Sequence, residues 1–295
     1  MNAIEVRGLR KSYGDLEAVR GVSFEVEEGE VLALLGPNGA GKTTIVEILE
    51  GYRERSDGEV RVLGHDPASG DVELRRRVGV VLQSSAIDRF LSVGEVLEMY
   101  AGYYPRPRRV DDVLALVGLT DKRDDRVRTL SGGQQRRLDV ALGLIGDPDL
   151  LFLDEPTTGF DPSARRQAWE LVRELRALGK TVLLTTHYMD EAQALADRIV
   201  IINGGRIVAA GTADAIGGRL DRGAVIRFGL PEGVSPPVDA TVDREGYFTF
   251  TSYDTTADLH RLTSWAVDRQ ITLAALTVVP PTLEDVYLEL TEEPS

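Results

Sequence analysis

The feature that most constrains this chain is a glycine-rich segment between an apolar run and a helical pattern. Residues 36–43 read Gly-Pro-Asn-Gly-Ala-Gly-Lys-Thr and fit the pattern G-x-x-x-x-G-K-[ST]. The apolar run Val31-Leu35 precedes the segment, and the helical stretch Thr44-Leu49 follows it. Because such a loop needs a strand before it and a helix after it, the context predicts a phosphate-binding loop within an α/β fold.

Each residue type in this loop has a chemical role. Glycines let backbone N–H groups crowd around a β-phosphate, and the N-terminus of the next helix adds partial positive charge. Lys42 can neutralise β- and γ-phosphate oxygens, and the Thr43 hydroxyl can ligate Mg²⁺. A glycine turn before a helix is the structural alternative. The predicted ATP-contacting residues are Gly36, Pro37, Asn38, Gly39, Ala40, Gly41, Lys42, Thr43 and Thr44.

A second apolar run ends in two acids. Leu150–Leu153 is followed by Asp154 and Glu155. Two carboxylates at the end of a buried strand are costly unless they face a cation or a reacting group. Asp154 suits a water-mediated contact with Mg²⁺, and Glu155 is placed to polarise the water that attacks a γ-phosphate. A solvated loop after a strand is the alternative for this pair.

The order of patterns predicts two domains. Up to about residue 211, short apolar runs alternate with helical patterns, which is typical of a mostly parallel α/β sheet. Ser92 and Glu95 predict a capping box at a helix start, and Asn203-Gly204 predicts a hairpin. The expected strands are residues 4–9, 22–26, 31–35, 78–82, 150–153, 182–185 and 199–202.

Composition changes after about residue 217, where Gly217-Gly218 is a plausible hinge. We expect residues 1–216 to form the nucleotide-binding domain and residues 217–295 to form a small α+β accessory domain without a catalytic motif. Its expected strands are 224–230, 247–250 and 271–279, with a helix through Leu259, Leu262 and Ala266 and a last helix over 282–289.

Composition narrows the compartment and the partners. The formal net charge of −14 counts modestly against nucleic acid, whose phosphates repel an acidic surface. The chain has no cysteine and three scattered histidines, which excludes disulfides and disfavours a zinc cluster. No stretch approaches the roughly 18 apolar residues of a membrane span, and the first residues do not resemble a signal peptide. A reducing cytoplasm is expected, and work at a membrane would need a separate partner.

Residues 130–134, Leu-Ser-Gly-Gly-Gln, resemble the signature motif of the ATP-binding cassette (ABC) family. Without that resemblance, Ser131 predicts an N-cap, and the two glycines read as a loop that opens a helix over 135–145. Consecutive glycines cost backbone entropy, and close approach of a phosphate would explain them. The resemblance implies that Ser131, Gly132, Gly133 and Gln134 contact nucleotide.

Other family elements follow in order. Tyr13 resembles the aromatic residue that stacks on adenine, and Gln83 resembles the Q-loop glutamine, with an implied catalytic and Mg²⁺-binding role. Asp161 closes a segment similar to the D-loop, which implies a nucleotide contact. His187, after an apolar run, resembles the catalytic switch histidine. Taken singly, Tyr13, Gln83 and His187 fit structural roles better than functional ones.

The resemblance covers about residues 3–215 and implies the fold of a P-loop NTPase of ABC type. Residues 155–162 and 187–192, together with the tail 281–290, look similar to the daunorubicin-resistance type of exporter ATPase. Phe160 stands where leucine is commoner in the family, and an apolar ring should still pack there. The small C-terminal domain would then be the accessory domain of that subgroup.

The family implies a partner set. We expect a homodimer in which two cassettes close head to tail on ATP. Ser131, Gly133 and Gln134 of one subunit would face the nucleotide-binding residues of the other, which are Lys42, Thr43, Asp154 and Glu155. A membrane permease would dock near residues 88–91, after Gln83, and hold the chain at the cytoplasmic face of the membrane. The expected activity is ATP hydrolysis that drives export of a drug, lipid or similar small molecule, with no nucleic-acid partner.

Three alternatives stay open at this point. A cassette ATPase of ribosomes or DNA usually carries two cassettes or a long coiled-coil insertion, neither of which is present. A catalytically silent regulatory subunit usually lacks the glutamate or histidine that stand here at 155 and 187. An importer ATPase is disfavoured by the exporter-like tail. The sequence does not reveal the cargo, because substrate choice belongs to the permease.

Overall fold

The computed structural model describes residues 1–81, 87–216, 223–231, 233–280 and 282–291. It divides into two compact units, residues 1–213 and 214–295, and each is described by itself. Within these described ranges, no helix has the length and apolarity needed to cross a bilayer.

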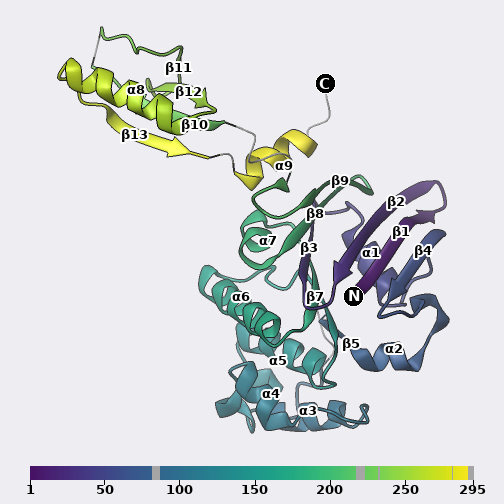
Figure 1. Cartoon of the computed structure of the whole chain (residues 1–295). Coiled ribbons are helices and arrows are strands. Elements are labelled where there is room, and N and C mark those ends of the chain that lie inside the picture. Colours follow the sequence, from purple (N-terminus) through teal and green to yellow (C-terminus); the bar gives the residue numbers. More distant parts are fainter. Residues whose placement is uncertain (82–86, 217–222, 232, 281, 292–295) are drawn as a thin grey trace. The chain divides into compact units, whose positions relative to one another are not determined.

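A six-stranded sheet forms the centre of the first unit (Figure 1). Its order is β5-β6-β7-β3-β8-β9, and every neighbouring pair is parallel except the β8–β9 hairpin. All positions of β3 and β7 are buried, as expected for apolar strands covered on both faces. The strands are β3 (Val31–Leu35), β5 (Val78–Val81), β6 (Leu150–Asp154), β7 (Thr181–Thr186), β8 (Arg198–Asn203) and β9 (Arg206–Gly211).

A smaller antiparallel sheet of order β2-β1-β4 lies against the same core. Its strands are β1 (Asn2–Tyr13), β2 (Leu16–Glu27) and β4 (Asp57–Val62). Helix α1 (Lys42–Leu49) places its side chains Ile45, Ile48 and Leu49 in this core, where Phe152 of β6 also lies. The helix that follows the glycine-rich loop is therefore anchored by its apolar face, which fixes the position of its N-terminus.

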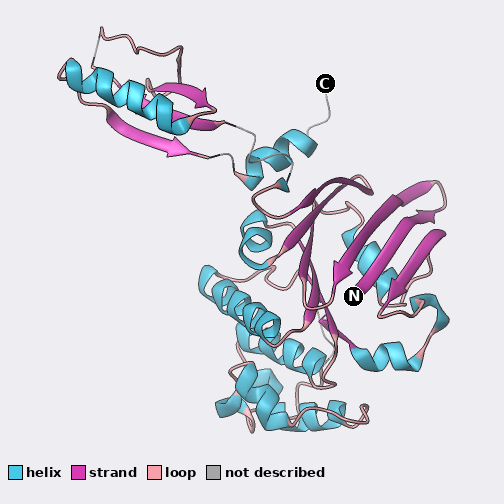
Figure 2. Ribbon diagram, in the orientation of Figure 1, coloured by secondary structure: helices cyan, strands magenta, loops and turns pink. Residues whose placement is uncertain are grey.

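The remaining helices of the first unit are visible in Figure 2. Ser92 and Glu95 form the predicted capping box at the start of α3. Gly204 and Gly205, with φ of 52° and 77°, form the predicted hairpin between β8 and β9. The helices are α2 (Val72–Arg77), α3 (Val93–Ala101), α4 (Val110–Leu116), α5 (Gly132–Leu144), α6 (Pro162–Ala177) and α7 (Met189–Leu195), with 3-10 turns at Pro67–Ser69, Thr120–Lys122 and Val127–Thr129.

Two sequence-based boundaries are wrong in informative ways. Helix α5 begins at Gly132, so the two glycines form its first turn and are not a loop before it. The strand expected over 271–279 begins only at Ala274, after Gln270 with φ of 57° ends the preceding turn. Leu82 and the Gly217-Gly218 hinge lie outside the described residues.

The second unit is a four-stranded antiparallel sheet of order β11-β12-β10-β13, with helix α8 packed on it. Ile226 and Phe228 of β10 are fully buried against Leu262 of α8, and they pair with Phe250 and Phe248 of β12. A parallel-sheet unit joined to a small α+β unit confirms the predicted fold class. The elements are β10 (Ala224–Gly229), β11 (Thr241–Val242), β12 (Phe248–Ser252), α8 (Thr255–Asp268), β13 (Ala274–Val279) and α9 (Leu283–Thr291).

Candidate functional site

The glycine-rich loop is shaped by close approach of the protein's own backbone. A Cβ atom on Gly36 would lie 2.2 Å from the carbonyl oxygen of Ile202, and one on Gly41 would lie 2.6 Å from that of Ala18. Gly41 also has φ of 104°, which side-chain-bearing residues rarely adopt. These two glycines are therefore required by packing, and they place the open N-terminus of α1 at the end of β3.

Lys42 is held inside this loop. Its side chain is 4% exposed, and its Nζ donates hydrogen bonds to the carbonyl oxygens of Gly36 at 2.8 Å and Pro37 at 3.1 Å. Burial lowers the pKa of Lys42, and the neighbouring carboxylates of Glu155 and Asp154 oppose that shift. The Lys42 amine is thus held at the loop by two neutral carbonyl oxygens, which negatively charged phosphate oxygens could replace as acceptors.

The two acids at the end of β6 have different environments. Asp154 Oδ1 accepts a hydrogen bond from Thr185 Oγ1 at 2.5 Å, across to the neighbouring strand β7. Glu155 has φ of 44°, a left-handed conformation that is uncommon for a residue other than glycine. Its N–H donates to Thr185 Oγ1 at 3.0 Å, so one threonine contacts both acids. Strained backbone of this kind clusters at functional sites.

The Glu155 carboxylate joins three segments that are distant in sequence. Its Oε1 lies 3.8 Å from Lys42 Nζ and 3.4 Å from His187 Nδ1. Its Oε2 accepts a hydrogen bond from Thr158 Oγ1 at 3.0 Å. His187 follows β7, and its ring lies 4.0 Å from that of Tyr188, centroid to centroid. A carboxylate that is 11% exposed and borders a cation and an imidazole can act as a base toward a water molecule beside it.

A cavity of about 320 Å³ opens beside this group. Thr43 is exposed in it, and Asn38 lies on the loop. Among the described residues, no group of three or more His, Cys, Asp or Glu side chains could hold a metal ion. A cation here would need phosphate or water oxygens to complete its shell, a donor set that Mg²⁺ accepts. The lining residues are Ala18, Asn38, Gly39, Gly41, Lys42, Thr43, Thr44 and Glu155.

The segment 131–134 forms the N-terminus of α5. Ser131 Oγ accepts a hydrogen bond from the Gln134 N–H at 3.3 Å, and Gln134 Oε1 accepts one from the Ser131 N–H at 2.9 Å. A Cβ on Gly132 would have no described heavy atom within 4 Å, and one on Gly133 would meet only Ala164 Cβ at 3.8 Å. Packing within this part of the chain therefore does not require either glycine, and the first turn of the helix is left open to an approaching group.

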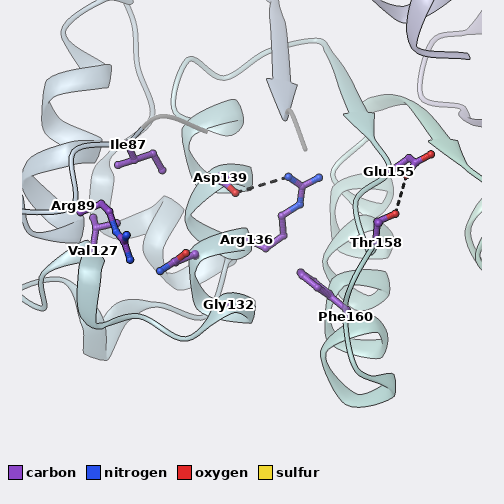
Figure 3. Close-up of a pocket in the computed structure, with 10 residues that line it drawn as sticks. Ile87, Arg89, Val127, Gly132, Arg136, Asp139, Glu155, Thr158 and Phe160 are labelled. Atoms are coloured by element: carbon purple, nitrogen blue, oxygen red, sulfur yellow. Dashed lines mark hydrogen bonds and ion pairs between the residues drawn. The ribbon is translucent and has the colours of Figure 1, made fainter. Parts of the chain in front are cut away.

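A second cavity, of about 640 Å³, is lined both by residues of α5 and by Glu155 (Figure 3). Arg136 and Asp139 come from α5, and Thr158 and Phe160 lie on the segment after Glu155. Its lining residues are Ile87, Arg89, Val127, Gly132, Gln135, Arg136, Asp139, Glu155, Thr158 and Phe160.

The other predicted residues have separate surroundings. Tyr13 is 40% exposed at the end of β1, and the charged ends of Lys11 and Arg53 each lie 5.2 Å from its ring. Asp161 caps α6, because its Oδ1 accepts hydrogen bonds from the N–H groups of Ser163 and Ala164. Neither Tyr13 nor Asp161 is among the described residues that line the cavity at Lys42. Gln83 lies outside the described residues.

Sequence reasoning missed several residues that surround the candidate base. Thr185 and Arg136 contact the backbone on both sides of Glu155. Glu191 of α7 is fully buried, and its Oε1 accepts hydrogen bonds from Thr157 Oγ1 at 2.8 Å and Trp169 Nε1 at 3.2 Å. Arg136 and Glu191 lie in helical patterns, where a charged residue is expected to face solvent, and Thr185 lies in a buried strand. Only the tertiary structure therefore identifies these three residues.

Family comparisons match both units. Residues 19–158 match the family described as ABC transporter, and residues 224–282 match the family described as ABC transporter domain-containing protein-like, C-terminal domain. Gly36, Lys42 and Glu155 fall inside the first match.

Two curated relatives span nearly the whole chain. The daunorubicin resistance ATP-binding protein DrrA3 of Streptomyces coeruleorubidus is 38% identical, over 98% of this chain and 96% of its own length. The Nod factor export ATP-binding protein I of Rhizobium sp. (strain N33) is 39% identical, over 98% of this chain and 97% of its own length.

A solved structure extends the likeness to three dimensions. It is the dimeric structure of an ATP-binding cassette in a post-hydrolysis state, bound to ADP and Pi. The likeness has a TM-score of 0.63 at 25% identity and covers 71% of this chain and 98% of the solved one.

Proposed function

This chain belongs to the ABC transporter family of ATPases, and we propose that it drives export of a small molecule through a separate membrane permease. One observation supports export over import. The relatives that match along almost their full length are named for daunorubicin resistance and for Nod factor export. A drug, a lipid or a similar small molecule is the proposed cargo class.

The observation that carries the proposed chemistry is the meeting of Lys42, Glu155 and His187. Glu155 and His187 directly follow the adjacent strands β6 and β7, and Lys42 begins the helix after the neighbouring strand β3. Lys42 Nζ and His187 Nδ1 lie within 3.8 Å of the Glu155 carboxylate. ATP phosphates would replace the carbonyl oxygens now bound by Lys42, and residues 36–44 would supply backbone N–H groups around them. Tyr13, exposed and flat, would stack on adenine.

Glu155 would polarise the attacking water, and His187 would hold the carboxylate and contact the γ-phosphate. Thr43 and Asp154 are the residues that would hold Mg²⁺, with Gln83 as a further ligand. When bound, the ion would compensate charge that develops on the β- and γ-phosphate oxygens. Hydrolysis removes the γ-phosphate and with it the negative charge around which these residues and the ion would be arranged. The site with ADP would therefore differ in its contacts from the site with ATP.

We assign the remaining nucleotide contacts to a second, identical chain. Ser131 to Gln134 form an open helix N-terminus, which is a ready site for an anion. In a head-to-tail dimer they would complete the ATP site of the partner chain, and Asp161 would lie at that junction. The dimeric cassette with ADP and Pi supports this arrangement. A γ-phosphate needs compensation on all sides, which two surfaces supply better than one.

The permease and the accessory unit complete the proposal. Residues 88–91 would receive a permease segment at the cytoplasmic face of the membrane, and Phe90 there is 69% exposed. We assign nucleotide chemistry to residues 1–216. Residues 217–295 would hold the two subunits together between ATP cycles or brace the cassette against the permease.

Phosphate release from the purified chain tests the activity. We expect turnover with ATP and Mg²⁺, loss of turnover with EDTA, and a sharp fall in nucleotide affinity for Lys42→Ala. Lys122→Ala is the matched control, because that lysine pairs with Asp125 and does not line the cavity at Lys42. Turnover in Lys42→Ala equal to that of the control would contradict the proposed site, and ATP binding without turnover in the wild-type chain would favour a silent regulatory subunit.

Co-expression tests the transport assignment. A neighbouring reading frame that encodes about six hydrophobic spans is the expected permease. Resistance or efflux that appears only with both genes, and is lost with Lys42→Ala, would support export. Uptake that depends on both genes would favour the importer alternative.

A further inference from the structure

Glu155 is held in a conformation that its own backbone disfavours. A left-handed residue with a side chain costs about 1–2 kcal/mol, and such strain persists only where the surroundings enforce it. On one side the enforcement is clear, because the Glu155 N–H donates to both the Oγ1 and the carbonyl oxygen of Thr185, at 3.0 and 3.2 Å. Those contacts fix the amide of Glu155. The peptide groups that follow Glu155 must be held by other residues.

Arg136 supplies contacts on both sides of Glu155. Its Nη2 donates to the carbonyl oxygen of Asp154, and its Nε donates to that of Pro156, each at 3.2 Å. The first carbonyl belongs to the peptide group that joins Asp154 to Glu155, and the second follows Pro156. One guanidinium therefore spans the backbone that carries the Glu155 side chain.

Arginine is suited to this task. Its planar guanidinium presents several N–H donors in a fixed geometry, which the single ammonium of lysine does not reproduce. The side chain is buried, with Asp139 Oδ2 at 3.8 Å from Nη1. Burial lowers the pKa of Arg136, and Asp139, Asp154 and Glu191 oppose that shift. A buried charge is costly, so its retention here needs a local reason.

We propose that Arg136 is a positioning residue for Glu155, which holds the strained backbone so that the carboxylate stays directed at Lys42 and His187. The inference rests on the proposed function, in which Glu155 activates the attacking water. Arg136 itself would not touch the nucleotide. It would act only through the orientation of Glu155.

The position of Arg136 on α5 extends the inference. Arg136 lies five residues after Ser131, about 7.5 Å along the same helix. A displacement of the helix N-terminus would also move Arg136, because both belong to the same hydrogen-bonded helix. Occupancy of the Ser131–Gln134 segment by the partner's nucleotide would thereby bias Glu155 in this chain, which would couple the two ATP sites.

The experiment compares three variants of the full chain. Arg136→Met removes the N–H donors while keeping an apolar stem. Arg136→Lys keeps the positive charge but lacks the planar set of N–H donors. Arg136→Met/Asp139→Asn removes both charges of the Arg136–Asp139 pair together, so that Asp139 is not left as a carboxylate without its cation. Arg137→Met is the matched control, because Arg137 donates its hydrogen bonds to the Gly118 carbonyl and the Gln167 side chain and not to residues 154–156.

We expect Arg136→Met and the double variant to bind ATP within about twofold of wild type, because residues 36–44 are unchanged. Their kcat should fall on the order of 10- to 100-fold, the loss expected when a catalytic group is misplaced by about 1 Å. Arg136→Lys should recover part of kcat, and Arg137→Met should match wild type. The Hill coefficient for ATP should fall toward one in the Arg136 variants, which a purely structural role would not produce.

Single-turnover hydrolysis allows a double-mutant cycle between Arg136 and Glu155. Because Arg136 acts through Glu155, Arg136→Met should not slow Glu155→Gln further. A full multiplicative loss in the combined variant, a wild-type kcat in Arg136→Met, or equal losses of ATP affinity and kcat would each overturn the inference. Failure of the proposed function looks different, because the wild-type chain would then lack turnover, or Glu155→Gln would hydrolyse ATP at a near wild-type rate.

Discussion

Replacing Glu155 by Gln removes one negative charge from the candidate site and changes its shape very little. The amide oxygen of Gln can still accept the hydrogen bond that Thr158 Oγ1 now donates at 3.0 Å. The neutral side chain can no longer draw a proton from water or pair with Lys42. The substitution therefore separates the role of the charge from the role of packing.

Two magnitudes follow from the geometry. At 3.8 Å, the attraction between Lys42 and Glu155 is about 4 kcal/mol for an effective dielectric constant near 20, before desolvation is counted. Lys42 keeps two carbonyl acceptors, so we expect a loss of about 1–3 kcal/mol in the free energy of unfolding without nucleotide. Loss of a general base lowers turnover by roughly 10²- to 10⁴-fold.

The assays are denaturant unfolding with and without ATP, phosphate release, and size-exclusion chromatography with ATP and Mg²⁺. ATP at about 100 times its Kd should add roughly 2.7 kcal/mol to the free energy of unfolding of the variant. An ATP-bound dimer should accumulate, because turnover has stopped. Glu170→Gln on the exposed face of α6 is the matched control. Near wild-type hydrolysis would remove Glu155 from the catalytic role, and unchanged stability without nucleotide would refute the argument from the buried pair.

Four further predictions concern other parts of the chain. Tyr13→Ala should weaken ATP binding by the ~1–3 kcal/mol of base stacking, measured by calorimetry; an unchanged Kd would make Tyr13 structural. Ser131→Arg should leave ATP binding by the monomer intact but prevent the ATP-bound dimer in chromatography, and equal loss of monomer binding would contradict a site shared by two chains. Burial, Asp154 and Glu47 raise the pKa of Glu50 from 4.5 to about 8, so the folded chain retains a proton that the unfolded chain releases. Stability without nucleotide should therefore fall as pH rises from about 5 to 8, by at most about 5 kcal/mol, and Glu50→Gln should flatten this slope in unfolding curves; parallel slopes would refute the assignment. Truncation after Gly217 should leave a folded, ATP-binding cassette with a weaker dimer or uncoupled transport, and a truncated chain equal to the full one in dimerisation, turnover and transport would make the tail dispensable.

Local features were predictable from sequence because their causes are local. Val31-Leu35 is apolar at every position and forms a buried strand, and the Ser92–Glu95 capping box forms as its spacing predicts. The Asn203-Gly204 pair likewise places a hairpin. The start of α5 differs from the sequence-based prediction, because glycine disfavours helix on average, whereas the Ser131 cap stabilises a first turn that includes Gly132.

By itself, the sequence determined the chemical groups available for nucleotide binding, since the loop 36–43 and the acids at 154 and 155 are contiguous motifs. Only the tertiary structure decided which groups meet. The strand order β6-β7-β3 aligns the carboxyl ends of three parallel strands, and so brings His187 and Lys42 within 3.8 Å of the Glu155 carboxylate. The roles of Thr185 and Arg136 depend on the same alignment, because a hydrogen bond to a strained backbone depends on spatial neighbours that no local pattern specifies.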